Sequence, residues 1–190
     1  MMVKICGITR REDAVAAAEA GADAIGFIFY KRSPRYVTPE KARELGDGLK
    51  LWKVGVFVDE IPGDSIMTDA ALDVMQIYGR VPDPLKPTVR FWQAVRIPEA
   101  GDFGWIPAYG EALLLDGSAN GVSFDWEMAK LFELDKKVII AGGLDDSNVG
   151  EAIRVGRPWG VDANSKLETA PGIKDHEKVR RFIDAARRSS

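Results

Sequence analysis

The sequence has one cysteine, Cys6, and one histidine, His176. A lone cysteine cannot form an intramolecular disulfide, and a lone histidine cannot build a multi-histidine metal site. The longest uncharged apolar stretch, residues 24–30, is far shorter than the roughly 20 residues of a membrane span. Charged residues interrupt the amino-terminal segment, so no signal peptide is visible. We therefore expect a cytoplasmic protein with no membrane partner.

The chain also lacks a basic excess, because its formal net charge is -3 and its pI is near 5.3. Binding to a phosphate backbone requires clustered Lys and Arg, so we expect no nucleic-acid partner. The arginines within residues 178–188 fit the solvated face of a last helix, whose carboxyl end favours positive charge. Catalysis in this chain must therefore use carboxylates, amines or the thiol.

Short β-rich runs recur along the chain with helical segments between them, which is the pattern of βα units that build a parallel sheet. With 190 residues and 46% hydrophobic content, one core and one domain are favoured. We predict an α/β fold, a compact (β/α)8 or TIM barrel that spans residues 1–190. The eight predicted strands are residues 2–6, 24–29, 53–58, 73–77, 89–95, 112–116, 137–141 and 159–162.

Helices are predicted between most of these strands. In the first, residues 9–21, Thr9 is placed to cap the N–H of Glu12 while Glu12 reaches back, and Gly21 follows the last turn. After strand five the helix is predicted to be reduced or missing, because residues 96–111 contain two prolines and three glycines. The other predicted helices are residues 39–46, 125–133, 146–156 and 174–188.

Catalytic groups of such barrels gather at the carboxyl ends of the strands. Period-two alternation places Lys4 and Cys6 on one face of the first strand, and Leu114 and Asp116 on one face of the sixth. If these faces line the lumen, Cys6 and Asp116 flank a substrate as base and acid. The alternatives are a small buried apolar thiol for Cys6 and a helix or turn cap for Asp116.

Two loops near the carboxyl end of the chain suggest a phosphate site. Gly142 and Gly143 follow the seventh strand, where backbone N–H groups can approach an anion closely, although ordinary loop glycines give the same pattern. Asn164 and Ser165 follow the eighth strand and supply further donors. We therefore expect a small phosphorylated ligand.

The loop after the second strand, "YKRSPRYV", carries Lys31, Arg32 and Arg35 around Pro34. A solvated charge run is one interpretation. The other is that an arginine binds an acidic substrate, since the guanidinium fork matches a carboxylate.

Several segments resemble phosphoribosylanthranilate isomerase of tryptophan biosynthesis: "KICGIT", "SPRYV", "VGVFVDE", "LLLD", "AGGL", "GVDANS" and "GIKDH". They occur in the family's order from residue 3 to about residue 183. The resemblance implies a cofactor-free and metal-free Amadori rearrangement, which converts N-(5-phosphoribosyl)anthranilate to 1-(2-carboxyphenylamino)-1-deoxyribulose 5-phosphate. It implies a monomer or a homodimer.

The resemblance also implies roles for residues at matching positions. Cys6 would be the general base, Asp116 the general acid, and Arg35 the group that holds the anthranilate carboxylate. The remaining candidates for substrate binding are Gln76, Gly142, Gly143, Asp162, Asn164 and Ser165.

The chain departs from the family at three places. "QIYG" places Tyr78 where a His is usual, and a phenol donates a hydrogen bond but is a poor base at pH 7. Lys166 replaces a Gly after the eighth strand, where it would either block a backbone approach or add a cation to the phosphate site. The loop after Asp116 is shorter than in many relatives.

The proposed chemistry needs a protonated Asp116 and an ionised Cys6, although ordinary pKa values of about 3.9 for Asp and about 8.5 for Cys favour the reverse. Desolvation must raise the pKa of Asp116, and a cation must lower that of Cys6. Lys4, two residues before Cys6 on the same face, is the candidate cation.

Two other functions are compatible with the sequence. The departures at Tyr78 and Lys166 are compatible with a sugar-phosphate-binding barrel that has lost catalysis, although the presence of both Cys6 and Asp116 argues against it. An isomerase of another aminated ribose phosphate is the second alternative, and Arg35 discriminates because only a carboxylated substrate needs it.

Overall fold

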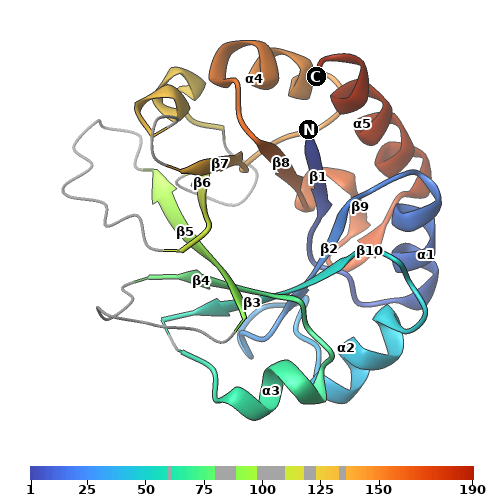
Figure 1. Cartoon of the computed structure of the whole chain (residues 1–190). Coiled ribbons are helices and arrows are strands. Elements are labelled where there is room, and N and C mark those ends of the chain that lie inside the picture. Colours follow the sequence, from blue (N-terminus) through green and yellow to red (C-terminus); the bar gives the residue numbers. More distant parts are fainter. Residues whose placement is uncertain (60, 80–88, 98–109, 118–122, 133–135) are drawn as a thin grey trace.

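The computed structural model describes residues 1–59, 61–79, 89–97, 110–117, 123–132 and 136–190. Eight parallel strands close into a barrel in chain order, and β8 pairs with β1 (Figure 1). This arrangement confirms the predicted fold class. The strands are β1 (Met2–Ile5), β2 (Ala24–Ile28), β3 (Trp52–Val58), β4 (Val74–Tyr78), β5 (Arg90–Ile97), β6 (Ala112–Gly117), β7 (Lys137–Ile140) and β8 (Gly160–Ala163).

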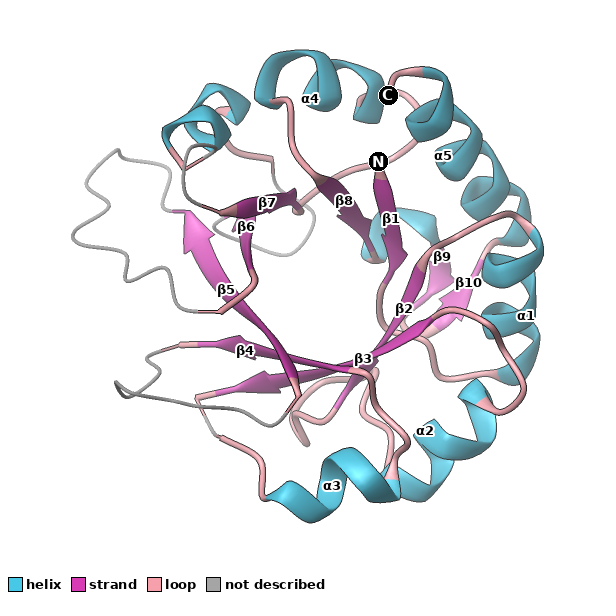
Figure 2. Cartoon of the chain, in the orientation of Figure 1, coloured by secondary structure: helices cyan, strands magenta, loops and turns pink. Residues whose placement is uncertain are grey.

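The α-helices lie outside the ring of strands, as Figure 2 shows. Within the segment predicted as a helix, residues 125–133, Trp126–Leu131 form a 3-10 helix instead, and residue 133 lies outside the described residues. The connection predicted to lack a helix after strand five also lies mostly outside them. The described helices are α1 (Arg11–Glu19), α2 (Pro39–Gly46), α3 (Asp64–Asp69), η1 (Trp126–Leu131), α4 (Val149–Gly156), η2 (Ser165–Leu167) and α5 (His176–Arg188). No helix among these residues is both long and apolar enough to span a membrane.

Two apolar cores follow from the alternation of side chains along each strand. Val3 and Ile5 belong to the outer core between strands and helices, as do Leu113 and Leu115. The inner core contains Leu114 and fills the barrel lumen. The predicted faces of the first and sixth strands are thereby confirmed.

Three indole rings close the amino-terminal end of the lumen. Trp92 is completely buried and packs edge-on against Trp52 and Trp159, with ring centroids 6.0 and 6.1 Å away. Trp52 and Trp159 stack on each other at 6.3 Å. Because this end is filled by aromatic side chains, a ligand enters the barrel at the opposite, carboxyl-terminal end.

The start of α1 differs from its prediction. Arg10 precedes the helix without a side-chain cap, and the Thr9 hydroxyl donates instead to the carbonyl of Gly172, 2.5 Å away. The predicted capping box with Glu12 is therefore wrong, because a tertiary partner distant in sequence takes the hydroxyl. Gly172 lies at the turn of a short antiparallel hairpin, β9 (Glu168–Ala170) and β10 (Ile173–Lys174), which lies between η2 and α5.

Candidate active site

A pocket opens at the carboxyl-terminal end of the barrel. Strand ends and loops from six of the eight βα units line it, and both predicted catalytic residues contribute. The lining residues are Cys6, Arg35, Tyr78, Asp116, Ala141, Gly142, Gly143, Leu144, Asp162, Ala163, Asn164, Ser165 and Lys166. Candidates that are far apart in the sequence thus meet at one concave surface.

Cys6 follows β1 directly and is 6% exposed. Two glycines make room around it. A Cβ on Gly26 would lie 2.7 Å from the Cys6 sulfur, and a Cβ on Gly7 would lie 2.5 Å from Oδ1 of Asn164. Gly7 also has a φ of +71°, which L side chains rarely adopt. Gly26 thus lets the second strand approach the thiol closely, and Gly7 lets Asn164 of the loop after β8 approach the backbone next to it.

Lys4 lies one layer below Cys6 inside the lumen. In the parallel register Lys4 is opposite Asp162, and its Nζ donates to Oδ2 of Asp162 at 2.6 Å. Burial alone would lower the pKa of Lys4, but the Asp162 carboxylate raises it above its usual value. Lys4 therefore stays charged directly beneath the thiol.

The electrostatics of Cys6 agree only in part with the prediction. Burial raises the pKa of the thiol above its ordinary value, while the Lys4 ammonium opposes burial and favours the thiolate. Asp162 adds to the rise, and Lys174 opposes it. Lys4 acts in the expected direction, but its effect on the pKa of Cys6 does not outweigh that of burial.

Asp116 lies on β6 at the pocket wall, where Tyr78 from β4 donates a hydrogen bond from Oη to Oδ2 of Asp116 at 2.8 Å. The strand between them carries Ala94 opposite Tyr78, and this small side chain leaves room for the phenol. Burial raises the pKa of Asp116 above its usual value, as predicted, and the Tyr78 hydrogen bond opposes this rise. Burial and the Asp116 charge raise the pKa of Tyr78 well above its ordinary value, so the phenol keeps its proton.

The predicted phosphate loops meet at one side of the pocket. Gly142 and Gly143 have φ values of +88° and +65°, so both glycines adopt the left-handed conformation that the turn after β7 requires. Asn164 and Ser165 face the same pocket from the loop after β8. The exposed Lys166 lines it as well, and its charge adds to a site that favours an anion.

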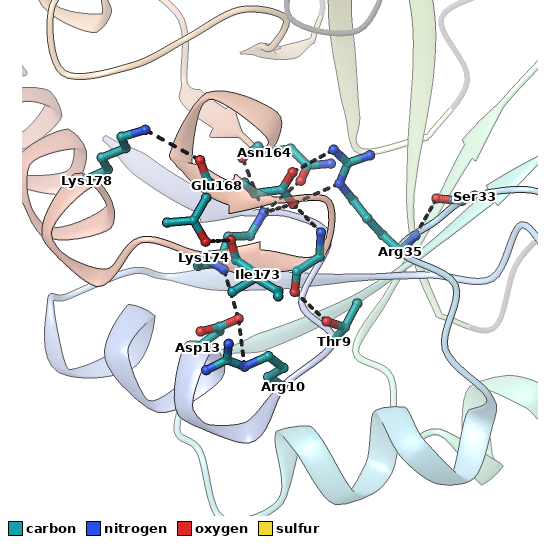
Figure 3. A network of polar contacts seen from close by, with 12 residues as sticks. Thr9, Arg10, Asp13, Ser33, Arg35, Asn164, Glu168, Ile173, Lys174 and Lys178 are labelled. Carbon is teal, nitrogen blue, oxygen red and sulfur yellow. Dashed lines mark hydrogen bonds and ion pairs between the residues drawn. The ribbon is translucent and has the colours of Figure 1, made fainter.

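Arg35 reaches the pocket from the loop after β2, but its guanidinium is already paired. Nε and Nη2 donate to the two carboxylate oxygens of Glu168 at 2.8 and 2.6 Å (Figure 3). Lys174 donates to the same carboxylate at 2.9 Å. Sequence reasoning did not single out Glu168 or Lys174, although Lys174 lies in "GIKDH", one of the segments that carry the family resemblance.

Gln76 is the one predicted site residue that does not line the pocket. Its side chain is completely buried in β4 and belongs, by alternation, to the same lumen face as Tyr78. Neither its amide nitrogen nor its amide oxygen has a hydrogen-bond partner in the described structure. It lies beneath the site rather than on its surface.

Comparisons with known proteins agree with this geometry. A family model described as N-(5'phosphoribosyl)anthranilate (PRA) isomerase matches residues 3–185. A curated N-(5'-phosphoribosyl)anthranilate isomerase from Solibacter usitatus is 44% identical over 98% of both chains. The chain belongs to the phosphoribosylanthranilate isomerase family.

Solved structures of the family share the whole fold. The isomerase from Thermus thermophilus is 35% identical, with a TM-score of 0.89 over 100% of both chains. A family structure solved with reduced 1-(o-carboxyphenylamino)-1-deoxyribulose 5-phosphate is 33% identical, with a TM-score of 0.83 over 98% of both chains. The resemblance inferred from the sequence is thus confirmed, and the chain is an isomerase of tryptophan biosynthesis.

Proposed function

We propose that this chain isomerises N-(5'-phosphoribosyl)anthranilate with Cys6 as general base and Asp116 as general acid. The observation that carries the proposal is that both side chains line one pocket, from β1 and β6, although 110 positions separate them in the sequence. No other thiol exists in the chain.

The two groups act on different atoms of one substrate. Protonated Asp116 donates to the furanose ring oxygen as the C1–O bond breaks and the nitrogen lone pair forms the C=N bond, which leaves an open-chain protonated imine. The Cys6 thiolate then removes the proton from C2, and the electron pair moves to form an enolamine. Protonation at C1 and loss of the hydroxyl proton at C2 complete the ketose. Each transfer is general acid-base catalysis, which contributes about 100-fold to 10,000-fold in rate per group.

Tyr78 orients the carboxyl group of Asp116. Its hydroxyl donates to Oδ2 of Asp116, so the proton that Asp116 delivers is carried on Oδ1. Burial supports the protonated state by raising the pKa of Asp116. The phenol that replaces the usual His thus serves as a donor and not as a proton carrier.

The substrate is held at both ends. Gly142, Gly143, Asn164 and Ser165 bind the phosphate through backbone and side-chain donors, and Lys166 adds a positive charge. Arg35 binds the anthranilate carboxylate. Asp162 acts through Lys4, whose ammonium it holds beneath the thiol at 2.6 Å.

The proposal extends to the class of substrate, the cellular compartment and the oligomeric state. The substrate is a small phosphorylated molecule, and the enzyme acts in the cytoplasm as a monomer or a homodimer. Sedimentation velocity of the purified protein distinguishes the two oligomeric states.

The experiment is a cofactor-free isomerisation assay that follows the loss of phosphoribosylanthranilate by its fluorescence. Cys6→Ala and Asp116→Asn should each lower kcat by about 100-fold or more, because each removes one proton-transfer group. Both variants should still bind reduced 1-(o-carboxyphenylamino)-1-deoxyribulose 5-phosphate, called the reduced product below, since neither residue holds the phosphate or the carboxylate. An unchanged kcat in either variant refutes the role of that residue.

A further inference from the structure

A group of buried charges lies beside the pocket, on the β9–β10 hairpin. The side chains of Glu168 and Lys174 are 4% and 0% exposed, and that of Arg35 is 12% exposed. Figure 3 shows these three side chains converging with Asn164, which directly follows β8 in the sequence. The proposed chemistry uses Arg35 but gives Glu168 and Lys174 no role.

Glu168 holds one edge of the Arg35 guanidinium. The bonds from Nε to Oε1 and from Nη2 to Oε2 form a two-point fork at 2.8 and 2.6 Å. A guanidinium has five N–H groups, so the fork leaves the opposite edge, formed by Nη1 and Nη2, as a second donor pair. That edge has the geometry to bind another carboxylate.

Glu168 is itself fixed and ionised. Its Oε1 also accepts from Lys174 Nζ at 2.9 Å and from the backbone N–H of Gly172 at 3.1 Å. Burial would raise the pKa of Glu168, but the bonds from Arg35 and Lys174 prevail and hold it below its usual value. Glu168 is therefore ionised, and hydrogen bonds from Arg35, Lys174 and Gly172 hold its carboxylate in place.

The charge balance of the group favours a second anion. Arg35 and a protonated Lys174 contribute two positive charges, and Glu168 contributes one negative charge; burial lowers the pKa of Lys174, and the Glu168 carboxylate opposes that fall. Lys174 also donates to Oδ1 of Asn164 at 2.8 Å, which connects the group to the phosphate side of the pocket. The group thus carries one net positive charge at the pocket wall, where a carboxylated substrate supplies its counter-charge.

We infer that Glu168 is a positioning residue that aims the free edge of Arg35 at the substrate carboxylate, and thereby sets the preference for a carboxylated arylamine. The inference rests on the proposed binding role of Arg35. It assigns to the hairpin a function in substrate discrimination, separate from proton transfer.

Glu168→Gln tests the inference, because glutamine keeps the size of the side chain but removes the charge and one acceptor of the fork. Two probes are compared by calorimetry: the reduced product, and the matched compound made from aniline, which lacks the carboxylate. We expect the Kd of the carboxylated probe to rise about tenfold, or about 1.4 kcal/mol, and that of the aniline probe to stay unchanged. KM for the substrate should rise by a similar factor, with kcat nearly constant.

Two further variants complete the design. Glu151→Gln removes an exposed ion pair with Arg154 on α4 and should leave both Kd values unchanged. Arg35→Ala should weaken only the carboxylated probe, and Glu168→Gln should add nothing in that background, because Glu168 acts through Arg35. If Arg35→Ala changes the Kd values of both probes equally, or changes neither, the proposed role of Arg35 itself is wrong. If Arg35→Ala weakens only the carboxylated probe but Glu168→Gln leaves both Kd values unchanged, the role of Arg35 holds and the inference about Glu168 is wrong.

The alternative roles of Glu168 give opposite results. If Glu168 merely occupies Arg35 until the substrate displaces it, Glu168→Gln will bind the carboxylated probe more tightly. If Glu168 only stabilises the fold, both probes will weaken equally. Should Glu168→Gln fail to fold, Glu168→Asp replaces it, since it keeps the charge but shortens the reach, and the same selective loss for the carboxylated probe is expected.

Discussion

Replacing Tyr78 with Phe removes one oxygen atom and, with it, the 2.8 Å hydrogen bond to Asp116. A hydrogen bond to an ionised group contributes about 1.5–3 kcal/mol, and this bond favours the carboxylate over the acid. Its loss shifts the ratio of protonated to ionised Asp116 by about 10-fold to 150-fold, since about 1.4 kcal/mol is a factor of ten. Burial acts in the same direction, so the pKa of Asp116 should rise in Tyr78→Phe.

The rise has a defined effect on activity. In the proposed mechanism the competent enzyme has a thiolate at Cys6 and a protonated Asp116, and it loses the thiolate when falling pH protonates both groups. When the pKa of Asp116 is higher, Asp116 and Cys6 are both protonated already at a higher pH. The acidic limb of the kcat/KM profile should therefore move to higher pH in Tyr78→Phe.

Carbon NMR of protein labelled at the aspartate carboxyl carbon measures the titration directly, with Asp116→Asn assigning the signal. Tyr30→Phe is the matched control, because it removes a phenol that does not line the pocket. An Asp116 titration identical in the wild type and Tyr78→Phe, or an acidic limb that moves to lower pH, would refute the reasoning.

Three further substitutions test the surroundings of the thiol. Gly26→Ala places a Cβ 2.7 Å from the Cys6 sulfur, so kcat should fall about 10-fold to 100-fold, whereas Gly63→Ala, with open space around it, should leave kcat unchanged. Lys4→Met should slow alkylation of Cys6 by iodoacetamide at neutral pH, because the thiolate loses its neighbouring cation. It should also lower the free energy of unfolding in urea by about 3–5 kcal/mol, because a buried ion pair is broken. An unchanged alkylation rate would show that Lys4 does not favour the thiolate. Gly7→Ala forces alanine to a φ of +71° and should cost about 1–2 kcal/mol of unfolding free energy, and equal stability in urea would contradict the strain argument.

The barrel was predictable because each strand has its own β-rich run and the alternation within it fixes its faces. Val3 and Ile5 point outward while Lys4 and Cys6 point inward, and this parity follows from sequence position alone. The start of α1 was not predictable in the same way. Thr9 bonds to Gly172, which is 163 residues away, and local capping rules cannot include such a competing partner.

The meeting of Cys6 and Asp116 at one pocket was predictable from the strand ends, but the surroundings of the two residues were not. Sequence showed Tyr78 only as a departure from the family, because its contact with Asp116 depends on a small residue in the strand between them. Glu168 meets Arg35 across 133 residues through a hairpin that has no strong local signal. Contacts of this kind arise when distant loops meet above the barrel, so they appear only in the folded chain.

The most direct test of the central claim is a crystal structure of this enzyme with the reduced product bound. We expect the Cys6 sulfur within about 3.5–4 Å of the carbon that loses its proton, and Asp116 within about 3 Å of the oxygen released from the ring. A bound ligand that leaves the sulfur or the carboxyl pointing away from these atoms would contradict the assignment of base and acid.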